Sequence, residues 1–237
     1  MPLPVVFIHG IRVSGTMWSP VRSCLTAPSA APDLPGHGSR RGVPYDTDAA
    51  CAVVAETIEE LGGRALVVGL SLGGYVGISV AARHPALVAG LVAMGCTARP
   101  DWIGAGLYRI AGRLAAADPE RADKMSRYGF RRALPGVAGE AVVEGGVHCE
   151  VMPSVVDAVA AEDPVASLAT YPGRVWLVNG SRDPFRVDER RFLRACRHGS
   201  LTHIPGRGHL TVLADPAWLA GYIDGAARAV TGCACAA

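Results

Sequence analysis

The sequence is short of net charge, of long apolar runs and of clustered cysteines. Its 237 residues carry a formal net charge of only +2, so the chain lacks the positive field that attracts nucleic acid. No stretch approaches the roughly 18 consecutive apolar residues of a membrane-spanning helix. The low net charge argues against nucleic acid as a partner, and the lack of long apolar runs argues against a membrane. We therefore expect a small-molecule substrate and a monomer or homodimer.

The cysteines and the start of the chain narrow the class further. The seven cysteines are odd in number and scattered, and neither a Cys-x-x-Cys pair nor a closely spaced histidine pair with a nearby acid marks a metal site. The segment from Met1 to Pro4 leads into an apolar pattern without a basic or cleavable leader. We expect reduced thiols, no metal, no cofactor and a cytoplasmic protein.

Short β-rich runs alternate with helical patterns, which is typical of βαβ units and a parallel sheet. After a capping Asp46, for example, Cys51, Val54, Ile58 and Leu61 recur at helical spacing. The strand candidates are residues 5–9, 29–33, 65–69, 88–94, 175–179 and 201–204. The sequence therefore predicts an α/β fold, with a mostly parallel sheet of about six strands flanked by helices.

The alternation fails between the fourth and fifth strand candidates. Here Gly and Pro separate four helical patterns, at residues 102–117, 119–134, 136–149 and 153–168. We interpret residues 99–170 as a helical lid, inserted into a core that consists of residues 1–98 and 171–237.

The motif Gly69-Leu70-Ser71-Leu72-Gly73 joins an apolar strand pattern to a helix of small residues. A sharp strand-to-helix turn forces its central residue into a strained conformation that lifts the side chain above the sheet. Glycine on either side leaves room for that close approach. Ser71 is therefore the candidate nucleophile, although the Gly-x-Ser-x-Gly spacing alone also arises by chance in glycine-rich chains.

A serine hydroxyl needs a base to take its proton, and the base needs a group that holds its tautomer. His209 follows the last predicted strand on a glycine loop, and Asp183 follows the strand before it. Both are expected at the carboxyl edge of the sheet, where open α/β sheets gather their ligand sites. We predict that His209 is the base and Asp183 the acid that orients it.

The oxyanion that forms on an attacked carbonyl needs two preorganised donors. The N–H of Leu72, the residue after the nucleophile, is one candidate. The N–H of Ile11 is the other, because Gly10 lets the loop after the first strand turn into the pocket. His9 is expected to brace that loop.

The candidates for substrate binding come from the same loops and from the predicted lid. Arg12 directly follows Ile11, and its planar fork suits a carboxylate, although a solvated loop arginine is the plainer interpretation. The remaining candidates are apolar or aromatic residues that we expect to line the pocket: Trp18, Trp102, Tyr128, Met152 and Leu210.

In this order and combination, the motifs resemble the α/β-hydrolase superfamily. They are His9-Gly10, Asp33-Leu34-Pro35-Gly36-His37-Gly38-Ser39, the turn at Ser71, Arg83-His84-Pro85, Asn179-Gly180-Ser181-Arg182-Asp183 and Gly208-His209. The resemblance implies serine-based acyl transfer under a helical lid. The family's sheet has eight strands, whereas this chain begins at what corresponds to the third, so we expect six. Some members carry the acid after an earlier strand, which leaves Asp101 as a rival to Asp183.

The resemblance leaves the reaction open. A Ser-His-Asp triad favours hydrolysis of an ester, thioester or lactone, and a serine at position 71 argues against the dehalogenase and epoxide hydrolase branches, which use an Asp nucleophile. The alternative is a cofactor-free lyase or cyclase that uses the triad as a base on a small, acidic metabolite. A receptor or scaffold role is the third possibility.

Overall fold

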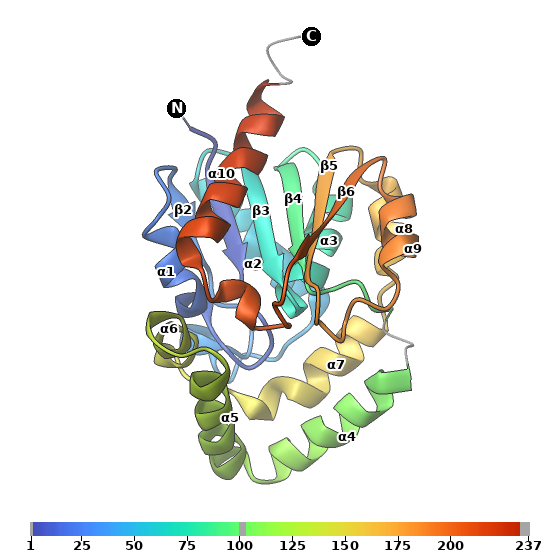
Figure 1. Cartoon of the computed structure of the whole chain (residues 1–237). Helices are drawn as coiled ribbons and strands as arrows, with labels where there is room; N and C mark the ends of the chain where they lie inside the picture. The colour runs from blue at the N-terminus through green and yellow to red at the C-terminus, as the bar shows by residue number, and fades with distance from the viewer. Residues whose placement is uncertain (1, 100–102, 233–237) are drawn as a thin grey trace.

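The computed structural model describes residues 2–99 and 103–232. In these ranges six strands form one sheet in the order β2-β1-β3-β4-β5-β6, and every neighbouring pair is parallel (Figure 1). The strands are β1 (Val5–Ile8), β2 (Ser29–Ala30), β3 (Ala65–Leu70), β4 (Val88–Met94), β5 (Arg174–Gly180) and β6 (His198–Ile204). The predicted α/β class and the six-stranded parallel sheet are confirmed.

Helices cover both faces of the sheet, which is why β1, β3 and β4 are apolar and buried along their whole length. One face packs against α1 and α10, and the other against α2, α3, α8 and α9 (Figure 1). The helices of these layers are α1 (Ser19–Arg22), α2 (Thr47–Glu60), α3 (Leu72–Arg83), α8 (Pro164–Thr170), α9 (Glu189–Ala195) and α10 (Pro216–Gly232). Short 3-10 turns lie at η1 (Gly15–Trp18), η2 (Gly38–Arg40) and η4 (Thr211–Leu213).

A helical insertion follows β4 and lies across the carboxyl ends of the strands (Figure 1). It comprises α4 (Ile103–Ala117), α5 (Pro119–Ala133), α6 (Val137–Glu144), η3 (Cys149–Val151) and α7 (Met152–Ala160). The predicted lid also contained α8, but α8 packs against α3 and α9 beside the sheet. None of the helices in the described ranges is long and apolar enough to cross a bilayer.

Three sequence-based boundaries differ from the structure. The predicted strand at residues 29–33 is a two-residue bridge, because Asp33 turns instead to cap loop N–H groups. The predicted helix at 153–168 is two helices, since Asp163 caps α8 and Pro164 begins it. The last strand starts at His198, three residues earlier than expected, and pairs there with Arg174.

Candidate active site

Ser71 occupies the turn between β3 and α3 in a strained backbone conformation, with φ 59° and ψ −118°. A positive φ is unusual for any residue that has a Cβ atom. The turn is held by the Ser71 N–H, which donates to the Met94 carbonyl at 2.8 Å, and by the Ser71 carbonyl, which accepts from Gly74 N–H at 2.9 Å. The residue is half-buried, so its hydroxyl remains accessible at the carboxyl edge of the sheet.

Glycine is required on both sides of this turn. A Cβ atom at Gly69 would overlap the Gly73 carbonyl, and a Cβ atom at Gly73 would overlap the Ile8 carbonyl. The first overlap would separate α3 from the end of β3, and the second would separate α3 from β1. The packing of α3 onto the strands therefore depends on the two glycines that the motif predicted.

His209 and Asp183 form a fixed pair next to this turn. The two residues meet at 2.9 Å between His209 Nδ1 and Asp183 Oδ2, and the Asp183 side chain is wholly buried. Its other oxygen, Oδ1, accepts from the Phe185 N–H at 2.8 Å, and the Phe185 ring packs 4.6 Å from the His209 ring between centroids. Because the carboxylate accepts from Nδ1–H, the free nitrogen of the imidazole is Nε2, the form that can act as a base.

Gly95 joins the pair to the serine turn, and sequence reasoning missed it. Its φ is 58°, and a Cβ atom there would lie 3.0 Å from both Asp183 Oδ2 and His209 Nδ1. Its N–H donates to the side chain of buried Asn179 at 3.0 Å. The preceding residue, Met94, accepts from Ser71. Residues 94 and 95 thus contact both the serine turn and the His209–Asp183 pair. The sequence signal that could have identified Gly95 was a glycine directly after a strand.

The loop after β1 completes the site. A Cβ atom at Gly10 would be 3.8 Å from the Ser71 Cβ, so this loop runs beside the serine. Within the described ranges, the N–H groups of Ile11 and Leu72 donate to no protein acceptor. In the same ranges the Ser71 hydroxyl makes no hydrogen bond to the protein, His209 included. Bonds of this kind often tighten only when substrate is present.

Two buried histidines support that loop from behind. His9 Nε2 accepts from the Leu34 N–H at 2.9 Å, so the ring is neutral and Nδ1–H donates to the Gly10 carbonyl at 2.8 Å. Burial lowers the pKa of His9 to about 4. The His37 ring lies 4.9 Å from that of His9, and its burial, together with its nearness to His9, lowers the pKa of His37 to about 3.

Arg12 connects the loop after β1 to the insertion. Its carbonyl accepts from the His148 N–H at 2.8 Å, and its Nη1 donates to Ser126 Oγ on α5 at 3.0 Å. The guanidinium carbon lies 5.2 Å from the centroid of the Phe130 ring, also on α5. The side chain therefore spans from the loop beside Ser71 to the helices above it.

The other predicted binding residues have different environments. Trp18 is fully buried in the core, with its ring 5.0 Å from that of Phe7. Met152 is buried in the same cluster, and Leu210 is partly buried against it. Tyr128 is 70% exposed, so its ring faces solvent instead of the core. Trp102 and the rival acid Asp101 lie outside the described residues.

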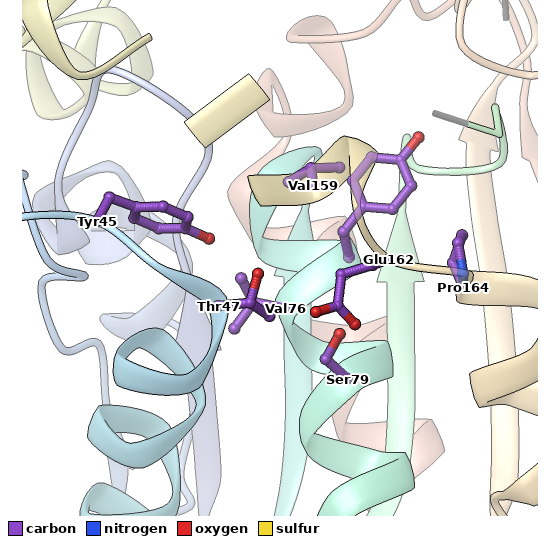
Figure 2. A pocket seen from close by; sticks show the side chains of 8 residues that line it. Tyr45, Thr47, Val76, Ser79, Val159, Glu162 and Pro164 are labelled. Atoms are coloured by element: carbon purple, nitrogen blue, oxygen red, sulfur yellow. The ribbon is translucent and has the colours of Figure 1, made fainter. Parts of the chain in front are cut away.

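A small cavity lies away from this site, on the flank of α3 (Figure 2). Its volume is about 10 Å³, which is room for about one water molecule. Ser71, Asp183 and His209 do not contribute to its walls, so it is separate from the candidate site. The lining residues are Tyr45, Thr47, Tyr75, Val76, Ser79, Val159, Glu162 and Pro164. Among the residues that the structure describes, no group of three or more His, Cys, Asp or Glu is arranged to hold a metal ion.

Known proteins share this sequence pattern in part. The chain is 32% identical over 168 residues to the lipase LipV of Mycobacterium tuberculosis, a match that covers 57% of this chain and 64% of the lipase. It is 38% identical over 97 residues to an esterase of the same organism, covering 39% of this chain and 33% of the esterase. The chain thus spans less than two thirds of the length of these curated relatives.

The fold is shared over nearly the whole chain. A thermophilic esterase from Thermogutta terrifontis superimposes with a TM-score of 0.79 at 22% identity, covering 96% of this chain and 90% of the esterase. The family described as "Alpha/beta hydrolase family" matches residues 5–221. That match includes the Ser71 turn, Asp183 and His209, so the family resemblance read from the motifs is confirmed. The chain belongs to the alpha/beta hydrolase family.

Proposed function

We propose that this chain is a serine hydrolase that cleaves a carboxylic ester of a small molecule. The observation that carries the proposal is the strained Ser71 turn beside the His209–Asp183 pair, which is held at 2.9 Å. A nucleophile, a base and an orienting acid are the groups that acyl transfer needs. The esterase and lipase names of the relatives favour esters, and thioesters and lactones react by the same steps.

The mechanism follows from these positions. Ser71 Oγ attacks the ester carbonyl while His209 Nε2 takes its proton, and the buried Asp183 carboxylate stabilises the resulting imidazolium. The N–H groups of Ile11 and Leu72 stabilise the oxyanion. His209 then protonates the departing alcohol, which leaves an acyl ester on Ser71. Water, activated by His209, hydrolyses this ester in the second half of the reaction.

The helical insertion is the proposed lid. It covers the carboxyl edge of the sheet (Figure 1). The Ser71 turn lies at this edge, after β3, and Arg12 connects the insertion to the loop beside the serine through Ser126. Met152, Leu210 and Trp102 are the apolar residues proposed to contact the acyl chain. We expect the insertion to set substrate preference, because a lid changes the pocket without moving the reacting groups.

A lyase or cyclase that acts on an acidic metabolite is the second candidate. It is favoured by Arg12, which is half-buried and, in the described ranges, pairs with no carboxylate. Such an enzyme would use the same pair as a base and release no acyl product. A panel of simple esters and thioesters separates the two, since only the hydrolase turns over members of the panel.

Replacing the nucleophile tests the proposal. Ser71→Ala should lower ester turnover by about 10⁴-fold or more, measured with 4-nitrophenyl acetate and butyrate, while the melting temperature changes little. A fluorophosphonate should label wild type at Ser71 and leave the variant unlabelled. Ser23→Ala removes an exposed serine hydroxyl and serves as the control that keeps full activity. Residual turnover near the wild-type rate in Ser71→Ala would refute the assignment.

A further inference from the structure

Arg12 is a half-buried arginine that has no acidic partner among the residues that the structure describes. Arg83, although it is an exposed arginine, pairs with Asp48 at 2.6 Å and with Glu162 at 2.9 Å. The contacts of Arg12 are neutral, namely the Ser126 hydroxyl and the Phe130 ring. In the part of the chain that the structure describes, no carboxylate lies within ion-pair distance of its guanidinium. A charge withdrawn from water without a counter-ion is unfavourable, so this position is suited to an anion from outside the chain.

One edge of the guanidinium carries a donor that has no partner in the described ranges. Nη1 is engaged by Ser126 Oγ, whereas Nε is buried and has no hydrogen-bond partner in the described ranges. Nε and Nη2 form the side of the guanidinium that binds both oxygens of a carboxylate. Because Nε is shielded from solvent, a carboxylate bound there would be held away from water, where ionic hydrogen bonds are strong.

The backbone of Arg12 is also unusual. Its φ is 72°, and among the described residues only Arg12 and Ser71 combine a positive φ with a side chain. The hydrogen bond from the His148 N–H holds the Arg12 carbonyl in this turn. Strained positions that a structure maintains tend to belong to functional sites. Here the strain directs the side chain from the loop beside Ser71 towards α5.

We propose that Arg12 binds a carboxylate carried by the substrate, so that the preferred substrates are half-esters of short dicarboxylic acids. The ester end lies at Ser71 and the free carboxylate at the Nε–Nη2 edge. The inference rests on the proposed ester hydrolysis and adds a substrate class to it. It predicts that an added negative charge on the acyl group improves turnover, although the same charge makes the group less apolar.

The test compares two methyl esters of equal chain length. Monomethyl glutarate ends in a carboxylate and methyl pentanoate ends in a methyl group, and hydrolysis of either is followed by proton release. Wild type should favour the half-ester by roughly 10- to 100-fold in kcat/KM, the range expected of ionic hydrogen bonds. In Arg12→Gln that ratio should fall to about one or below, and in Arg12→Lys it should be intermediate, because the charge stays and the fork is lost.

Arg132→Gln is the matched control, since Arg132 is an exposed arginine of α5, the helix that Arg12 contacts. It should keep the wild-type ratio. If Arg12 served only as a tether for the insertion, Arg12→Gln would lose activity on both esters by the same factor and would melt at a lower temperature. An unchanged ratio in Arg12→Gln therefore overturns the proposal.

A binding measurement separates this proposal from the hydrolase proposal. Glutarate, the product dicarboxylate, is titrated calorimetrically into Ser71→Ala and into Ser71→Ala combined with Arg12→Gln. We expect binding that weakens at least tenfold when Arg12 is replaced. If no ester is hydrolysed but this difference is found, the hydrolase proposal fails and the carboxylate site stands. Equal binding by the two proteins removes the carboxylate site, whatever the outcome with esters.

Discussion

The two buried histidines behind the loop after β1, His9 and His37, predict a loss of stability in mild acid. Burial holds the pKa of His9 at about 4 and, with the nearby His9 ring, that of His37 at about 3. In the unfolded chain both would titrate near 6.5. Below that pH the unfolded chain therefore binds protons that the folded chain does not, and folding becomes less favourable as the pH falls. The contribution of the two neutral histidines to the free energy of unfolding is complete above pH 6.5. It is lost as the pH falls from 6.5 to the pKa values of His9 and His37 in the folded chain.

The size of the effect follows from these values. Between pH 7.5 and pH 5.0 each histidine costs about 2 kcal/mol of unfolding free energy, or about 4 kcal/mol together. That is a large share of the ~5–15 kcal/mol that stabilises a typical domain. Asp33 does not add to this loss of unfolding free energy between pH 7.5 and pH 5.0. Burial raises its pKa, but hydrogen bonds from Gly15 and Ser39 outweigh burial, so its stabilising effect is lost only at lower pH.

Urea unfolding at pH 7.5 and at pH 5.0 measures the difference in unfolding free energy between the two pH values. His37→Asn should reduce it by about 2 kcal/mol, because the amide replaces Nδ1–H as the donor to the Pro35 carbonyl and does not titrate. His198→Asn changes an exposed histidine and should leave the wild-type difference intact. A wild-type loss below ~1 kcal/mol, or a full pH dependence in His37→Asn, would refute the reasoning.

Two further changes test the site from other directions. Asp183→Asn should lower kcat for ester hydrolysis by about 10⁴-fold, because an amide cannot hold the base tautomer of His209. Near-normal activity in Asp183→Asn, together with loss of activity in Asp101→Asn, would assign the role of the acid to Asp101. Gly73→Ala should lower the free energy of unfolding by several kcal/mol in urea titration, because the new Cβ atom overlaps the Ile8 carbonyl. Gly129 is exposed and unobstructed in α5, so Gly129→Ala should be neutral or stabilising by ~1 kcal/mol.

The sheet and the serine turn were predictable because each depends on local pattern. Strands buried on both faces are continuous apolar runs, and a glycine-flanked serine between such a run and a helix is typical of a nucleophile turn. The approach of Asp183 to His209 was predictable for a related reason, since parallel strands bring their carboxyl ends to one edge. None of these features depends on the exact ends of the strands.

The insertion was harder to predict, because its helices are placed by tertiary contacts. A hydrophobic stripe indicates that Met152 faces apolar neighbours, but it does not indicate which ones. The same kind of pattern predicted that Tyr128 lines a pocket, whereas its side chain faces solvent in the structure. Trp18 was expected on a pocket wall and is instead fully buried against Phe7. Arg12 was identified as a candidate, but its lack of an acidic partner among the described residues is a property of the folded chain.

The separation of core and insertion has a consequence for substrate choice. Gly69 and Gly73 leave no space for change at the serine turn, and the buried His9 holds the neighbouring loop through two hydrogen bonds. Variation there would disturb the Ser71 turn itself. Arg12 is where the loop meets the insertion, since its carbonyl and its guanidinium both contact inserted residues. A change in the insertion can therefore alter which group Arg12 meets while Ser71 keeps its position. Under the proposed function, selectivity and chemistry can then vary independently.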